Sequence, residues 1–85
     1  MARPHIVRTP AQLGASLRMR RRELGFSQGD VAGRINARQA TVSSVESGAA
    51  DARLSTLMDL LAALNLELVL RPRDASGRPD IEDLF

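Results

Sequence analysis

The apolar residues of this chain recur mostly at helical spacing, and the middle of the sequence shows this in two short segments. In residues 27–48 the positions that set the period are Val31, Ile35, Val42 and Val45. Asn36 lies between the segments, and Asn is the best substitute for Gly where a tight turn needs a positive φ. Ser27 suits a helix N-cap, and Gly48 suits a helix stop. The pattern predicts two short helices joined by a tight turn, which is a helix-turn-helix.

A longer helix is expected before this stretch. Thr9 is a capping residue type, Pro10 suits the first helical position, and Gln12 would complete a capping box with Thr9. We expect the helix to run to about Leu24 and to stop at Gly25.

A further periodic stretch, residues 54–64, predicts the last helix. The stripe at i, i+3, i+4 and i+7 consists of Leu54, Leu57, Met58, Leu61 and Leu64. Three more apolar residues, Leu60, Ala62 and Ala63, widen this stripe beyond the need of a small monomer. We therefore expect the helix to pack in the core and to meet a second chain with the rest of its apolar surface.

The period changes to two in residues 66–71, which read LELVLR. Strict alternation predicts a β-strand with Leu66, Leu68 and Leu70 facing one way and Val69 between them. A lone strand needs a partner for its backbone groups, and the simplest one is the same strand from a second copy, antiparallel across a two-fold axis. The alternatives are a continued helix or an ordered coil.

Charge divides the chain into two parts. All basic residues are arginine, and residues 1–73 hold eleven arginines against six acids, whereas residues 74–85 hold one arginine against four acids. A basic body suits a nucleic-acid partner, because arginine binds phosphates and guanine edges bidentately. The acidic end carries Ile81, Leu84 and Phe85, which suggests docking on a partner, a protease signal or an inert frayed end.

The sequence lacks the residues that several classes of protein function require. The 85 residues contain no Cys and a single His, His5, so we expect no disulfide, no metal and no cofactor. No apolar run approaches a membrane span, the first ten residues lack the apolar core of a signal peptide, and we expect a cytoplasmic, nucleoid-associated protein. Nothing resembles catalytic chemistry, because Glu46 and Asp59 have easier structural roles and Gly29-x-x-x-Gly33 lies inside a helix without a following Lys.

The second helix of the helix-turn-helix presents residue types that read base edges. Its outward, N-terminal face consists of Arg38, Gln39, Ala40, Ser43 and Ser44. Arginine pairs with guanine, glutamine with adenine, alanine contacts a thymine methyl, and serine bonds either kind of base. Taken alone, Ser44 and Arg38 fit an ordinary helix surface, but the whole set on this helix predicts direct contacts to bases.

Other polar residues suit contacts to the DNA backbone. Ser27 and Gln28 lie at the N-terminus of the first short helix, where N–H groups favour a phosphate. Thr41 is expected to cap the helix or to contact a phosphate. Arg18 is assigned to the backbone as well, although a solvated helix side is the simpler explanation for Arg18 and Arg22.

The residues Gln28, Ala32, Gln39, Thr41, Val42, Ser43 and Glu46-Ser47-Gly48 resemble the Xre/Cro, lambda-repressor-like class. From Ile6-Val7 through Arg38-Gln39-Ala40-Thr41 to residues 66–71 and the acidic tail, the chain resembles HipB-like antitoxins. The resemblance implies an ion pair between Arg21 and Glu46, contact of Gln28 with DNA and with Gln39, and a two-stranded lid over a homodimer. Arg20 departs from the class, which usually has an apolar residue there.

These observations predict a mainly α, lambda-repressor-like helix-turn-helix bundle with one C-terminal β-strand that pairs across a homodimer. Residues 1–8 would form a flexible arm, residues 9–71 the DNA-binding and dimerisation domain, and residues 72–85 a disordered acidic tail. The resemblance implies an antitoxin that binds palindromic operator DNA, represses its own operon and neutralises a HipA-like Ser/Thr kinase. A free-standing Xre-family repressor and an interaction module without DNA binding remain the alternatives.

Overall fold

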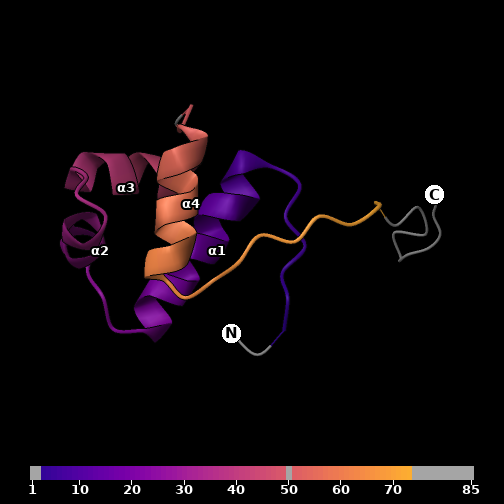
Figure 1. Ribbon diagram of the computed structural model, residues 1–85, viewed down its shortest axis with the longest axis horizontal. Coiled ribbons are helices and arrows are strands. Elements are labelled where there is room, and N and C mark those ends of the chain that lie inside the picture. Colours follow the sequence, from indigo (N-terminus) through magenta and orange to yellow (C-terminus); the bar gives the residue numbers. More distant parts are fainter. Residues whose placement is uncertain (1–2, 50, 74–85) are drawn as a thin grey trace.

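The computed structural model describes residues 3–49 and 51–73, and this part of the chain is mainly helical. Four helices follow one another along it, namely α1 (Pro10–Glu23), α2 (Gln28–Arg34), α3 (Gln39–Ser47) and α4 (Leu54–Ala63). Figure 1 shows α3 lying roughly horizontally above α2, and α4 standing upright beside them. The prediction of a helical bundle with a helix-turn-helix at its centre is confirmed.

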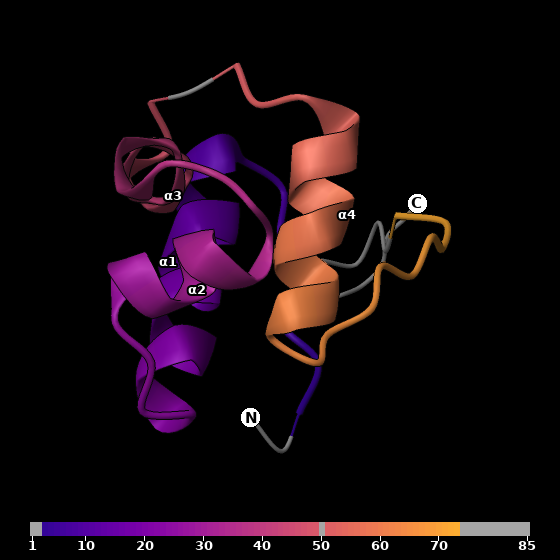
Figure 2. The same cartoon turned by 60° about the vertical axis from the view of Figure 1, so that its left-hand side comes forward.

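A small apolar core holds the four helices together. Its buried residues come from every helix and are Leu17, Val31, Ala32, Val42, Val45, Leu60, Leu61 and Leu64. Helix α3 packs against both α1 and α2, and α4 packs against α2 (Figure 2). Val42 and Val45 therefore bury one face of α3 and leave the opposite face at the surface.

The turn between α2 and α3 is built as the sequence predicts. Asn36 has a φ of 56°, and the following Ala37 N–H donates to the carbonyl of Ala32 at 2.9 Å. Ala32 is buried at this crossing, where a larger side chain would separate the helices. Gly25 and Gly48 end α1 and α3 with a φ of 76° each.

The helix starts differ in one respect from the prediction. Thr9 Oγ1 accepts a hydrogen bond from the Gln12 N–H at 3.1 Å, but Gln12 Oε1 accepts from the N–H of Arg8 at 2.7 Å instead of from Thr9. The reciprocal half of the predicted capping box is therefore displaced by one residue. A complete capping box occurs at α2, between Ser27 and Asp30.

A close approach between α1 and α3 depends on Gly14. A Cβ built on this glycine would lie 2.3 Å from the carbonyl oxygen of Glu46 and 2.5 Å from that of Val45. Any side chain here must push α3 away from α1. The spacing between these two helices is therefore set by a residue without a side chain.

The buried face of α4 includes Leu57, Leu61 and Leu64 of the predicted stripe, but it is rotated toward Leu60. Leu60, Leu61 and Leu64 are buried, whereas Leu54 is 70% exposed and Met58 is 46% exposed. The apolar width allowed either face to turn inward, and contact with α2 selects the Leu60 side. Leu54 and Met58 are left as apolar surface.

Beyond α4 the chain is extended, and no strand is assigned between residues 51 and 73. Leu66 packs against the core, while Leu68, Val69 and Leu70 are 52, 69 and 89% exposed. Among residues 3–49 and 51–73 no backbone hydrogen bond pairs residues 67–73 with another segment, so the strand across a dimer stays a prediction. The interpretations placed on residues 74–85, with Ile81, Leu84 and Phe85, lie outside the described residues.

The N-terminal segment before α1 contacts that helix. Its residues from 3 to 9 have no helix or strand, and their side chains are exposed. His5 Nδ1 lies 3.1 Å from Ser16 Oγ on α1. Together with the bond between Arg8 and Gln12, this contact lays the segment along the first turns of α1.

Candidate nucleic-acid interface

The N-terminal end of α3 is a polar surface. Arg38 is the N-cap residue, with a φ of −86° and no hydrogen bond from its side chain to the helix. All five residues predicted to contact bases are exposed, namely Arg38, Gln39, Ala40, Ser43 and Ser44. Because Val42 and Val45 hold the opposite face in the core, these side chains project away from the bundle.

The residues predicted to contact the DNA backbone differ in how exposed they are and in whether they already have a partner. Gln28 and Thr41 are half-buried, and Arg18 is exposed on α1. Ser27 is committed to its own helix, since its Oγ accepts the Asp30 N–H at 3.0 Å and its N–H donates to Asp30 Oδ2 at 2.8 Å. The Ser27 side chain therefore acts first as a helix cap.

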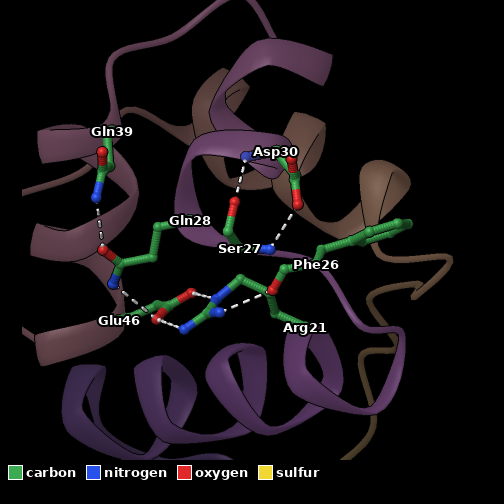
Figure 3. Close-up of polar contacts among 7 residues, drawn as sticks. All are labelled: Arg21, Phe26, Ser27, Gln28, Asp30, Gln39 and Glu46. Atoms are coloured by element: carbon green, nitrogen blue, oxygen red, sulfur yellow. Dashed lines mark hydrogen bonds and ion pairs between the residues drawn. The ribbon is translucent and has the colours of Figure 1, made fainter.

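A bidentate ion pair joins α1 to α3 beneath the polar surface. Arg21 Nε donates to Glu46 Oε2 at 2.7 Å, and Nη2 donates to Oε1 at 3.0 Å. Only 10% of the Arg21 side chain and 5% of the Glu46 side chain are exposed. Arg21 Nη1 also donates to the Phe26 carbonyl at 2.9 Å, so the guanidinium holds three elements at once (Figure 3). Breaking such a pair strands a buried charge.

The same contacts keep Glu46 ionised. Burial favours the neutral carboxyl, but the hydrogen bonds from Arg21 and Gln28, with the charges of Arg21 and Arg18, lower the pKa of Glu46 below its ordinary value. The hydrogen bond to Glu46 raises the pKa of Arg21 against the opposing effect of burial. Both partners therefore stay charged around neutral pH, which makes the hydrogen bonds between them strong.

A line of polar contacts runs from the ion pair to the exposed end of α3. Gln28 Nε2 donates to Glu46 Oε1 at 3.1 Å, and Gln39 Nε2 lies 3.5 Å from Gln28 Oε1 (Figure 3). We call these four residues, Arg21, Glu46, Gln28 and Gln39, the polar relay. The last contact is long, so Gln39 is oriented but keeps hydrogen-bonding capacity for a base edge.

Two further residues lie beside the polar surface and were not singled out from the sequence. Arg53 and Thr56, at the start of α4, line an open hollow together with Arg38, Thr41 and Ser44. The sequence places this helix start fifteen residues after Arg38, and only the packing of α4 brings the two together. No motif in the sequence signals this neighbourhood.

Two further features that help to place the site were not predicted. The Ser27–Asp30 capping box has a local S-x-x-D pattern in the sequence, whereas nothing around Gly14 indicates its close approach to α3. Arg34 lies over the Phe26 ring, 4.3 Å from its centroid, and covers the loop between α1 and α2. In residues 3–49 and 51–73, no group of His, Cys, Asp or Glu side chains is arranged to hold a metal ion.

A family model described as a helix-turn-helix domain matches residues 12–73. Over 62 residues the chain is 31% identical to antitoxin HipB of Escherichia coli strain K12. The matched stretch covers 73% of this chain and 70% of HipB. The chain belongs to the HipB-like helix-turn-helix family. Gln39 and Glu46 thus lie in a DNA-binding domain, and the residues around them form its candidate interface.

Solved structures agree with this assignment. A structure described as a HipA-HipB-O2-O3 complex superposes with a TM-score of 0.74 at 28% identity, covering 80% of this chain and 96% of the other. The restriction-modification controller protein C.AhdI of Aeromonas hydrophila gives a TM-score of 0.65 at 29% identity, covering 68% of this chain and 84% of the other. The chain is thus a DNA-binding regulator related to the HipB antitoxin and shares its fold with other regulators. These relatives are regulators and antitoxins, not enzymes.

None of the helices in the described part of the chain is both long enough and apolar enough to cross a membrane.

Proposed function

We propose that this protein is a dimeric antitoxin that binds palindromic operator DNA, represses its own operon and holds a HipA-like Ser/Thr kinase inactive. The observation that supports the DNA-binding part best is the polar relay. It uses buried charges to fix α1, α2 and α3 against one another, and it ends on an exposed Gln39 at the tip of α3. Such a rigid support is what precise reading of base edges requires.

In this proposal α3 enters the major groove. Arg38, Gln39 and Ala40 contact bases at the N-terminal end of the helix, with Ser43 and Ser44 one turn further along. Gln28, Thr41 and Arg18 contact phosphates, and Ser27 contributes through the helix start that it caps. Because arginine contacts displace counterions, the affinity for DNA should fall steeply as salt rises.

The proposal of a dimer rests on the exposed apolar residues of the segment that follows α4. Leu68, Val69 and Leu70 are exposed in an extended segment whose backbone lacks a neighbour in the single described chain. Antiparallel pairing with the same segment, Leu66 included, would supply hydrogen bonds and bury these side chains. A two-fold axis through this pairing would present both α3 helices to one side of a duplex.

The kinase partner is proposed from similarity to HipB, whose solved complex is described as containing HipA. Purification of the untagged chain from its own host, followed by mass measurement of the intact complex, tests this part. Two copies of the chain with a kinase-sized partner support the antitoxin. A complex that contains only this chain would contradict it.

A second candidate is a free-standing transcriptional regulator, and the similarity to the C.AhdI controller protein favours it. It shares every prediction about DNA and differs only in the missing toxin. A duplex from upstream of the chain's own gene, compared with a scrambled duplex at physiological salt, tests the shared part. Equal binding to both duplexes would contradict both candidates and would favour a module that has lost DNA binding.

A further inference from the structure

We propose that Arg20 is a positioning residue that sets the direction in which the chain leaves α4, and thereby the separation of the two α3 helices in the dimer. This inference rests on the dimer of the proposed function. Its starting point is a contact between residues 44 positions apart, in which Arg20 Nε donates to the Leu64 carbonyl at 3.0 Å. No other side chain described from α1 bonds to the backbone of α4.

Neighbouring arginines of α1 serve different partners. Arg21 turns toward α3 and pairs with Glu46, whereas Arg20 turns toward the end of α4. The two contacts make α1 a bridge between the helix-turn-helix and the exit of the C-terminal segment. Arg20 is itself braced one turn along, because its Nη1 lies 3.6 Å from Glu23 Oε1.

The end of α4 is where the chain changes direction. Asn65 has a φ of 55°, its N–H donates to Ala62 O at 3.1 Å, and the Leu66 N–H donates to Leu61 O at 2.8 Å. The carbonyl of Leu64, the C-cap residue, receives the guanidinium of Arg20. A positive group at this end also complements the helix dipole. The turn is thus tied by its own backbone and by one side chain from α1.

Beyond this turn, Leu66 is the one residue of the described segment 65–73 that packs against the core. Leu66 is half-buried against the core, and residues 67–73 are exposed. The path of residues 67–71 therefore depends on how the turn at Leu64 and Asn65 is held. A charged hydrogen bond is directional, whereas the apolar residue usual at this place in the class supplies only packing. Across a two-fold axis, a rotation at this exit changes the placement of both helix-turn-helix units.

The test measures the distance between the two helix-turn-helix units of the dimer. The chain has no native Cys, so Gly33→Cys gives a unique position for a nitroxide label. Gly33 is exposed on α2, and no atom lies within 4 Å of an added Cβ. Double electron–electron resonance on the labelled dimer then reports the separation of the two copies, and sedimentation gives the mass.

Three substitutions separate positioning from general stability. Arg20→Met removes the donor at similar length, and the distance distribution should shift or broaden. Arg20→Gln places an amide N–H the same number of bonds from the backbone as Arg Nε, so it should restore the wild-type distribution. Arg22→Met removes an exposed arginine of the same helix and should leave the distribution unchanged. Helical circular dichroism checks the fold of each variant.

The outcomes separate this inference from the proposed dimer. A dimeric wild type with an unchanged distribution in Arg20→Met overturns the positioning role alone, and so does an equal change in Arg22→Met. A monomeric wild type overturns both the dimer and the inference. Should Arg20→Met lose its helical signal, Arg20→Leu replaces it, because the class usually carries an apolar residue there. Loss of the fold in both variants also overturns the inference, since Arg20 is then needed for folding.

Discussion

The two sides of this molecule differ in how much of their apolar surface a single chain buries and how many of their buried charges it pairs. On the side of α1, α2 and α3, buried apolar residues and the polar relay leave each described buried charge paired. On the side of α4 and residues 66–71, Leu54, Met58 and Leu70 are exposed, and residues 66–71 have no assigned strand partner in the described part of the chain. The first side holds a surface rigid, and the second is the side that we propose to meet another chain.

The largest expected effect is on dimerisation and concerns the side of α4 and residues 66–71. Leu68→Asp with Leu70→Asp should leave the helices intact, because both side chains are exposed in the single chain. It should abolish the dimer, since each buried leucine contributes about 1.5–3 kcal/mol. The dissociation constant of the dimer should rise by roughly two orders of magnitude or more, as measured by sedimentation. Ala52→Asp with Ser55→Asp adds the same charge at exposed positions and should keep the dimer.

The next largest effect is on the stability of the fold and concerns the side of α1, α2 and α3. Glu46→Gln leaves Arg21 buried without its carboxylate and should destabilise the fold by about 3 kcal/mol. Thermal unfolding at a fixed chain concentration measures this loss. The matched exchange on an exposed acid, Asp59→Asn, should change the melting temperature little. Equal losses in both variants would show that the ion pair carries no special stability.

A smaller effect is expected at the tip of the polar relay. Gln39→Ala should keep the fold, because the side chain is exposed, and should cost about 1–3 kcal/mol of binding at one base position. Arg18→Ala should instead weaken all duplexes by similar factors, because this exposed residue is assigned to the backbone and lies outside the polar relay. Fluorescence anisotropy on duplexes that differ at single positions separates the two patterns. Unchanged base preference in Gln39→Ala would remove Gln39 from the reading surface.

The smallest effect is the dependence of stability on pH. Because the folded pKa of Glu46 lies below its ordinary value of 4.5, its stabilising contribution is present above that pH and is lost as pH falls through the folded value. The difference in unfolding free energy between wild type and Glu46→Gln should therefore be constant from pH 6 to 8 and shrink in acid. Denaturant unfolding across this range measures it. A difference that grows in acid would contradict the assignment.

Much of the fold could be predicted because helix signals are local. The Asn36 turn, the Thr9 and Ser27 starts and the Gly25 and Gly48 stops each depend on a few neighbouring residues. The inward face of α4 could be predicted in part: Leu57, Leu61 and Leu64 of the stripe meet the core, but the wide apolar surface did not show that Leu60 would be buried in place of Leu54 and Met58. The Gln12 bond to Arg8 also depended on the path of the chain before α1.

The candidate site also has features that could be predicted from the sequence and features that could not. The polar face of α3 follows from helical period, and the Arg21–Glu46 pair follows from resemblance to the class. Contacts between distant segments gave no sequence signal, as with Arg20 at Leu64 or Arg53 beside Arg38. In residues 66–71 the period predicts a strand, but the described part of the chain has no strand there, and pairing with a second copy stays a prediction.

Selection of duplexes from a random-sequence library by the purified full chain tests the central claim most directly. Two α3 helices related by a two-fold axis should enrich an inverted repeat with half-sites about 10 base pairs apart, centre to centre. Enrichment of a single unrepeated half-site would contradict the dimer, and no enrichment at all would contradict sequence reading by α3.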